Sequence, residues 1–135
     1  MSAPDGVLAE YDTGPISREM LAAYAEASGD LNPLHLDPAF ARKAGFDDVI
    51  VHGMLGMALL GRLLSEHYAD RPLLKFDARF AAVLPVGRSL CCRARLADAR
   101  PDTPDDGHLR LALEATDPAG TVIISGNAEL AAAGP

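Results

Sequence analysis

An irregular segment early in the chain holds three side chains that could carry out acid and base chemistry. Asp30, Asn32 and His35 lie within residues 29–38, where two prolines exclude a regular helix. On a loop, a carboxylate and an imidazole five positions apart can face one water molecule, one accepting a proton while the other donates one. The spacing alone leaves a plainer interpretation open, in which Asp30 ends a helix and His35 is an ordinary loop residue.

A second candidate site lies at the start of an apolar stretch, in the sequence Val51-His-Gly-Met54. The N-terminus of a helix presents unpaired backbone N–H groups and a partial positive charge, which can stabilise a developing oxyanion. A glycine at this place, Gly53, lets a ligand oxygen approach the backbone. The plainer alternative is a simple helix start at which the glycine only eases a turn.

His52 could also serve as a metal ligand together with His35, Asp30 or Asp37. The sequence has no His-x-x-x-His pair and no spaced cysteine pair, which are common signatures of a metal site. It therefore predicts no metal site, and we expect no cofactor.

Length and charge exclude several classes of protein. The chain has 135 residues, which suits one domain with a proper core, and we expect a single domain over residues 1–135. Twelve basic against nineteen acidic residues give a net charge of −7, which argues against a nucleic-acid-binding protein. The longest apolar stretch, residues 53–64, contains Arg62 and is too short to span a bilayer, so we expect no membrane partner.

The cellular compartment is inferred from the N-terminus and the cysteines. Residues 1–12 have neither the basic nor the apolar region of a signal peptide. Cys91 and Cys92 are adjacent, and neighbouring strand residues make poor disulfide partners because their side chains point to opposite faces. A reducing, cytoplasmic compartment is the simplest expectation.

Helix signals dominate the first half of the chain. Ser17 matches an N-cap, and Ile16 and Leu21 occupy the two positions of a hydrophobic staple around it. The stretch that begins at Gly53 is apolar on almost every side, which predicts a buried helix. The expected elements are, in chain order, a strand at 7–11 closed by a turn at 12–15, a helix from Ser17 to Ser28-Gly29, a short helix at 38–43 and a long helix at 53–68.

Strand patterns dominate the second half. Apolar and polar residues alternate with period two in four segments, which predicts strands with one buried face, joined as an antiparallel meander. The faces expected to be buried are Phe76, Ala78, Phe80 and Ala82; Leu90, Cys92, Ala94 and Leu96; Leu109, Leu111, Leu113 and Ala115; and Val122, Ile124, Gly126, Ala128 and Leu130. Because the apolar helix and the sheet must bury each other, we expect an α+β domain with the sheet wrapped around the helix.

Three stretches of the sequence form a specific pattern. They are Tyr24-Ala-Glu-Ala-Ser-Gly-Asp-Leu-Asn-Pro-Leu-His35 followed by Asp37, Ala41 and Gly45; Val51-His-Gly-Met54; and Arg79-Phe-x-x-x-x-Pro-Val86. Together they closely resemble the MaoC-like hydratase/dehydratase family, which includes R-specific enoyl-CoA hydratases and β-hydroxyacyl-ACP dehydratase subunits. The resemblance implies a hot-dog fold, in which an antiparallel sheet wraps a long central helix, and pairing of two such domains.

The resemblance also implies a reaction and roles for particular residues. Asp30 and His35 would activate the water that adds to C3 of a trans-2-enoyl thioester, giving the (3R)-hydroxyacyl thioester in a reversible reaction. The Gly53 backbone N–H would bind the thioester carbonyl, Asn32 would fix the loop, and His52 and Met54 would contact the substrate. The expected partners are an acyl-CoA or an acyl-carrier-protein thioester and a second copy of the chain in a homodimer, with a heterodimer as the alternative.

One departure from the family and two alternatives stay open. Some hydratases of the family carry a serine in the central helix where this chain has Gly61, which suggests a deeper or differently shaped acyl tunnel. A hot-dog thioesterase would use a carboxylate on or near this helix, and only Glu66 is available there. The chain could also be the catalytic subunit of a heterodimeric acyl-ACP dehydratase.

Overall fold

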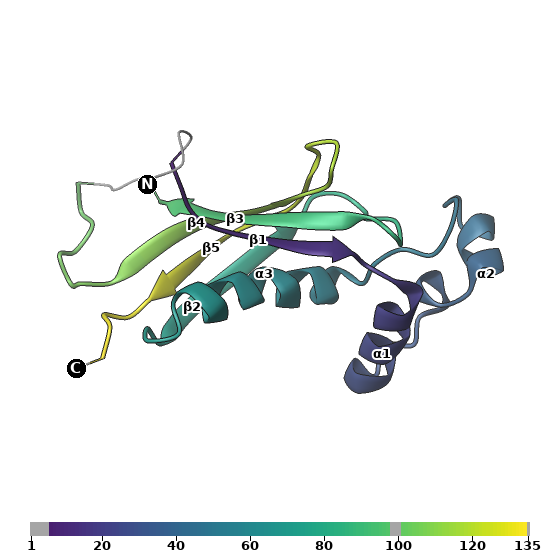
Figure 1. The fold of residues 1–135 in the computed structure, drawn as a ribbon, viewed down its shortest axis with the longest axis horizontal. Helices are drawn as coiled ribbons and strands as arrows, with labels where there is room; N and C mark the ends of the chain where they lie inside the picture. Colours follow the sequence, from purple (N-terminus) through teal and green to yellow (C-terminus); the bar gives the residue numbers. More distant parts are fainter. Residues whose placement is uncertain (1–5, 98–100, 135) are drawn as a thin grey trace.

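The computed structural model describes residues 6–97 and 101–134, and a five-stranded antiparallel sheet with a long helix along one face forms its body (Figure 1). The elements are β1 (Val7–Pro15), α1 (Arg18–Ser28), the 3-10 turn η1 (Pro33–His35), α2 (Pro38–Lys43), α3 (Gly53–His67), β2 (Leu73–Phe80), β3 (Ser89–Leu96), β4 (Leu109–Thr116) and β5 (Val122–Leu130). The expected α+β hot-dog architecture, with α3 as its central helix, is confirmed.

The strand order β1-β3-β4-β5-β2 corrects the expected meander of four successive strands. Only β3, β4 and β5 follow one another, while β2 pairs with β5 and β1 pairs with β3. The contact between β2 and β5 depends on a glycine, because a Cβ on Gly126 would overlap the backbone carbonyl of Asp77. The alternation of apolar and polar residues within a strand does not indicate which distant strand it pairs with, so the sequence pattern could not predict this pairing.

Strand β1 is longer than expected, because it includes the residues assigned to a closing turn. Asp12 pairs with Cys91 and Pro15 with Ser89, and the register shifts between the two pairs. Gly14 lies within this irregular part with a φ of +67°, a conformation that favours glycine. The turn signal thus marks a bulge in a continuous strand.

The core lies between one side of α3 and the inner face of the sheet. Leu60 and Leu63 of α3 are fully buried, as are Leu90 of β3 and Leu111 of β4. Each such side chain contributes about 1.5–3 kcal/mol through its removal from water. This burial fixes α3, and with it the position of the helix N-terminus.

Two of the expected buried faces end earlier than predicted. Phe76 and Ala78 of β2 are half-buried, but Phe80 is 49% exposed and Ala82 is exposed. Leu96, at the end of β3, is 63% exposed. All three residues stand at or beyond the end of a strand, and within the described ranges they remain exposed.

Helices α1 and α2 lie beyond one end of the sheet (Figure 1). The predicted cap of α1 is confirmed, because Ser17 Oγ accepts a hydrogen bond from Met20 N at 3.1 Å. Ile16 and Leu21, which occupy the two staple positions, are both fully buried in the core. The helix ends as expected at Gly29, which has a φ of +80°. The segment that leads to η1 therefore leaves α1 in a fixed direction.

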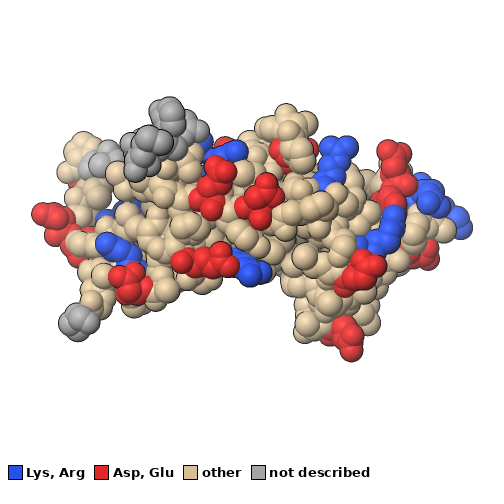
Figure 2. All heavy atoms as spheres, in the orientation of Figure 1, with Lys and Arg blue, Asp and Glu red and all other residues tan. Residues whose placement is uncertain are grey.

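The visible surface carries both signs of charge side by side (Figure 2). No helix in the described ranges combines the length and hydropathy that a bilayer-spanning segment needs. Both cysteines are free, as expected. The expectations of one domain over 1–135 and of an N-terminus without a leader involve residues 1–5, 98–100 and 135, which lie outside the described residues.

Candidate active site

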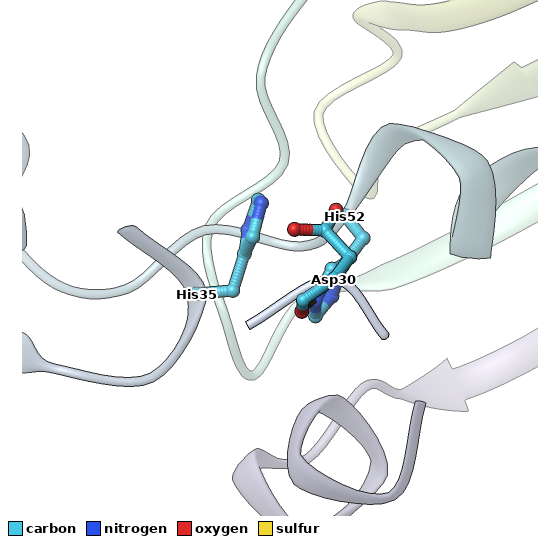
Figure 3. Close-up of side chains that lie close together, drawn as sticks. All are labelled: Asp30, His35 and His52. Atoms are coloured by element: carbon cyan, nitrogen blue, oxygen red, sulfur yellow. Dashed lines mark hydrogen bonds between the residues drawn. The ribbon is translucent and has the colours of Figure 1, made fainter. Parts of the chain in front are cut away.

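The structure brings Asp30, His35 and His52 together although they come from two separate segments (Figure 3). One side-chain atom of each lies within 4.8 Å of the corresponding atoms of the other two. Asp30 is exposed, His35 is half-buried and His52 is buried, so the group spans the boundary between solvent and core. The predicted proximity of Asp30 and His35 is therefore present in the geometry.

Local hydrogen bonds shape the segment that carries the carboxylate. Asp30 N donates to Ser28 Oγ at 3.1 Å, and Asp30 Oδ1 accepts from Asn32 N at 3.3 Å. Asn32 Oδ1 in turn accepts from Leu34 N at 3.0 Å, which makes Asn32 the N-cap of η1. The side chain of Asn32 thus holds the turn that places His35, which is consistent with its predicted role of fixing the loop.

A backbone carbonyl sets the tautomer of His35. His35 Nδ1 lies 2.8 Å from the carbonyl oxygen of Ile50, and Ile50 N donates to the Leu34 carbonyl at 3.1 Å. Since a carbonyl only accepts, Nδ1 carries the hydrogen of the neutral ring and Nε2 keeps a lone pair. His35 can therefore accept a proton at Nε2.

His52 is almost completely buried, with 1% of its surface exposed. Its Nε2 lies 3.2 Å from the backbone carbonyl oxygen of Asp30, so this nitrogen carries the hydrogen, while Nδ1 has no hydrogen-bond partner. Burial lowers the pKa of His52 and outweighs the opposite effect of the hydrogen bond with the Asp30 carbonyl, and the nearby His35 also lowers this pKa. The ring stacks on that of His35 at 3.8 Å between centroids, and Tyr24 contacts it edge-on at 4.8 Å.

Gly53 begins α3 beside this cluster. His52 is the N-cap residue but makes no side-chain capping bond, and the first helical hydrogen bond runs from Gly56 N to the His52 carbonyl. The N–H of Gly53 precedes that bond and is available to a ligand oxygen. Met54, also predicted to contact substrate, is 55% exposed in the first turn. The roles of both residues stay predictions.

An apolar cavity of about 220 Å³ adjoins the cluster. Its polar lining includes His35 and His52, and Gly53 and Gly56 provide a stretch of helix without side chains. The remaining lining residues are Ile50, Val51, Phe80, Ala82, Val83, Leu84, Leu90, Ile123 and Ile124. The arrangement suits a ligand with an apolar tail and a reactive polar end next to Asp30 and His35.

Gly61 does not line this cavity, so the expectation that it leaves a deeper or differently shaped acyl tunnel is wrong for the cavity beside Asp30 and His35. A Cβ on Gly61 would lie 3.3 Å from the ring of Phe76, which occupies the space beside the glycine. Gly61 instead lines a separate hollow with Leu64 and Tyr68. The departure from the family at this position therefore accommodates an aromatic ring of β2.

The carboxylate expected for a thioesterase lies away from the cavity. Glu66 is in the last turn of α3 and forms an ion pair with Arg62, with a distance of 2.8 Å between Nε and Oε1. It is not among the residues that line the cavity. The position of Glu66 does not favour the thioesterase alternative.

The distances among Asp30, His35 and His52 also allow a metal ion to be considered. Each imidazole lone pair lies in its own ring plane, and the two stacked rings are within 23° of parallel. The lone pairs of two nearly parallel, stacked rings therefore do not point at one nearby position. A zinc ion requires ligand nitrogens whose lone pairs point at it from about 2.0–2.1 Å. These donors do not fit a common zinc ion, and the absence of a metal stays a prediction.

Sequence reasoning missed two contributors to the site. The Ile50 carbonyl fixes the His35 tautomer, and a backbone atom has no signature in the sequence. Phe80 was predicted only as an inner-face residue of its strand, and its ring lies at the site, 3.4 Å from where a Cβ on Gly53 would stand. The Arg79-Phe80 pair within the quoted motif is the one signal that could have indicated it.

Comparison with known proteins agrees with the geometry. The family model described as "MaoC like domain" matches residues 2–109. The mitochondrial 3-hydroxyacyl-[acyl-carrier-protein] dehydratase of Arabidopsis thaliana is 41% identical over 76 residues, which are 56% of this chain and 46% of that protein. The (R)-specific enoyl-CoA hydratase of Aeromonas caviae is 37% identical over 86 residues, which are 62% of this chain and 64% of that protein.

A solved structure extends the likeness over nearly the whole chain. The R-hydratase PhaJ1 from Pseudomonas aeruginosa superposes with a TM-score of 0.83 at 29% identity, covering 94% of this chain and 80% of that one. The chain spans less than two thirds of the length of the two sequence relatives. The family match, the fold and the Asp30–His35 geometry agree, and the chain belongs to the MaoC-like domain family.

Proposed function

We propose that the chain catalyses the reversible hydration of trans-2-enoyl thioesters to (3R)-hydroxyacyl thioesters. The observation that carries the proposal is the approach of Asp30 and His35 to within 4.8 Å beside an apolar cavity. Two hydrogen bonds of about 2.8 Å through one water span such a separation. The names of the relatives from Arabidopsis and Aeromonas support the same reaction class.

The pair would hold the water by its two hydrogens. The ionised Asp30 carboxylate accepts one hydrogen bond, and His35 Nε2 accepts the other because Nδ1–H is engaged by the Ile50 carbonyl. The oxygen lone pair of the water then points toward C3 of the enoyl group. One member of the pair removes a proton as the C3–O bond forms, and a proton is delivered to C2.

The N-terminus of α3 would stabilise the charge that this addition creates. Electrons pushed out of the C2–C3 double bond accumulate on the thioester oxygen, giving an enolate-like species. The Gly53 N–H and the positive end of the helix dipole would face that oxygen, and the absence of a side chain at Gly53 allows the approach. Proton transfer to C2 then restores the thioester carbonyl.

The cavity would take the acyl chain, and the thiol carrier would remain outside. A volume of about 220 Å³ with an almost wholly apolar lining suits a short acyl chain. Coenzyme A and acyl carrier protein both present the thioester on a long flexible arm, so either can serve. The two are separated by assaying the same acyl group on each carrier.

The partner would be a second copy of the chain, paired along β2. This strand has β5 as its partner strand within the described ranges, and its Leu73, Leu74 and Phe80 are 48%, 51% and 49% exposed. An edge strand with apolar side chains favours pairing with another strand. Light scattering of the purified chain distinguishes a homodimer from a monomer that needs a related subunit.

The compartment would be a reducing one, such as the cytoplasm. Cys91 and Cys92 are free thiols, and no partner cysteine occurs elsewhere in the chain. Fractionation of the source cells, followed by detection of the chain, tests this location.

The decisive experiment is hydration of crotonyl-CoA, followed as the loss of the enoyl thioester's ultraviolet absorbance. Wild-type protein should turn over the substrate and give the (3R) product on chiral analysis, and Asp30→Asn should abolish most of the activity. Release of free thiol, measured with a thiol reagent, serves as the control for thioester hydrolysis. Thiol release without hydration, or hydration that Asp30→Asn leaves unchanged, would overturn the proposal.

A further inference from the structure

A buried histidine with one unpartnered nitrogen lies directly behind the two groups to which the proposed function assigns the chemistry. His52 is 1% exposed, and its Nδ1 has no hydrogen-bond partner. A buried polar atom without a partner destabilises the fold, because its hydrogen bond to water is lost and not replaced. An apolar side chain of similar size would avoid this cost, so the imidazole must contribute something that such a side chain cannot.

The contacts of His52 show what that contribution is. Its Nε2–H donates to the carbonyl of Asp30, the residue whose carboxylate faces His35 (Figure 3). The flat face of the same ring stacks on His35, with 3.8 Å between centroids and 23° between planes. One side chain therefore contacts both members of the pair, the first through a hydrogen bond and the second through a ring face.

We propose that His52 is a positioning residue that holds Asp30 by its backbone carbonyl and His35 by its ring plane, so that both converge on one water molecule. This inference rests on the proposed function and deepens it, since it adds a third residue on which the geometry of the pair depends. Positioning matters because a misplacement of about 1 Å can cost roughly 10²-fold in rate.

The environment of His52 keeps the ring in the neutral form that this role requires. A protonated ring would place a second N–H in a buried site where Nδ1 has no acceptor, and it would repel the proton that His35 receives. Tyr24 closes the other side edge-on. His52 thus offers one donor and two flat faces without competing for the proton.

The two contacts can be separated by substitution. His52→Phe keeps a flat ring against His35 and removes the donor to Asp30, whereas His52→Gln keeps a donor of similar reach and removes the ring. Each variant should lower kcat for crotonyl-CoA by roughly 10-fold or more, a larger factor than any change in KM, because positioning acts on the reacting pair while His52 supplies one of thirteen residues that line the cavity.

The matched control is His67, at the other end of the same helix. Its Nδ1 lies 2.9 Å from the carbonyl of Leu63, so it also bonds to the backbone through a ring nitrogen. His67→Phe and His67→Gln should leave kcat and KM unchanged. Thermal unfolding of all four variants separates loss of position from loss of fold, since a merely structural His52 would lose activity only in proportion to the fraction unfolded.

A double-mutant cycle tests whether His52 acts through the pair. An Asp30→Asn background has no carboxylate at position 30 to take a proton, so the pair no longer depends on positioning. Adding His52→Phe there should lower kcat by less than about 2-fold. Equal costs in the two backgrounds, or variants at position 52 with wild-type kcat, would overturn the proposal.

An NMR measurement that does not need enzymatic activity tests the positioning role of His52 separately from the proposed reaction. The ring protons of His35 should show an upfield NMR shift from the stacked ring, retained in His52→Phe and lost in His52→Gln. If wild-type protein fails to hydrate crotonyl-CoA while these shifts behave as described, the proposed reaction fails and the positioning contacts stand. If the shifts do not depend on His52, the positioning proposal fails whatever the activity.

Discussion

The scaffold and the site segment of this protein are held together by different forces. In the scaffold, α3 packs on β1, β3 and β4 through side chains such as Leu60, Leu63 and Leu111, which water does not reach. In the segment from Asp30 to Asp37, most side chains are exposed, and side chain-to-backbone hydrogen bonds hold the turn. Burial provides the stability, and a few local bonds direct the chemistry, so changes in the two regions should have separable effects.

The largest effect should come from the scaffold. Leu63→Ala removes a fully buried side chain from α3 and leaves a cavity, which should lower the free energy of unfolding by about 2–5 kcal/mol. Leu96→Ala is the matched control, since Leu96 is 63% exposed and its loss should cost less than about 0.5 kcal/mol. Urea unfolding at one protein concentration measures both, and equal losses would erase the distinction between core and strand end.

The next effect should appear in the site segment and leave stability alone. Asp30→Asn and His35→Ala should each lower turnover of an enoyl thioester by roughly 10²-fold or more, as expected when a general acid or base is lost. The free energy of unfolding should change little for Asp30→Asn, because Asp30 is exposed and the amide still offers an oxygen to Asn32 N. A double variant that remains active would remove both residues from the mechanism.

Two helix caps, one in each region's neighbourhood, allow the effects on stability and on turnover to be compared for substitutions of smaller expected effect. Ser17 caps α1 and Asn32 caps η1, each through a side-chain oxygen that accepts a backbone N–H. Replacing either by alanine should weaken its own element by about 1 kcal/mol. Ser17→Ala should therefore lower the melting temperature and leave kcat unchanged.

Asn32→Ala should do the opposite, because η1 carries His35 and contributes little to the core. We expect a fall in kcat of several-fold, up to roughly 10-fold, with a small change in melting temperature. Steady-state kinetics and thermal unfolding of the two variants give the comparison directly. If both variants lose only stability, the capping of η1 does not position the imidazole.

Elements specified by local signals could be predicted from the sequence. The cap at Ser17, the burial of Ile16 and Leu21 on either side of it, and the apolar helix from Gly53 depend on residues within a few positions of one another, and the structure confirms them. The pairing of β2 with β5 could not be predicted, because a strand's alternation indicates which face is buried and not which strand lies beside it.

The candidate site divides in the same way. The proximity of Asp30 and His35 follows from a short loop and from the family resemblance, and the structure brings them together. The Ile50 carbonyl and the stacking of His52 on His35 depend on where a segment 15 or more residues away returns to the loop. Contacts of that kind are decided by the packing of α3, which the sequence describes only as apolar.

The smallest effect concerns an exposed ion pair between α1, which precedes the site segment, and the chain that follows it on the way to α3. Arg18 of α1 donates two hydrogen bonds to the carboxylate of Asp48, in the segment that leads to α3, and Arg18 lowers the pKa of Asp48 to about 2. Because the pKa is lower in the folded state than the ordinary value of about 3.9, the stabilisation is present above pH 4. It is lost as the pH falls from about 4 through about 2.

Asp48→Asn should therefore flatten part of the dependence of stability on pH below 4 and change little at pH 7, where an exposed pair contributes weakly. Asp106 is the matched control, because Arg110 lowers its pKa to about 2 at the start of β4, away from α1. Hydrogen exchange of α1 amides between pH 2.5 and 5 should change in Asp48→Asn and not in Asp106→Asn. Identical exchange rates of the α1 amides in both variants would mean that the ion pair between Arg18 and Asp48 does not stabilise α1. The direction in which the site segment leaves α1 would then depend on the buried Ile16 and Leu21 and on the Gly29 cap alone.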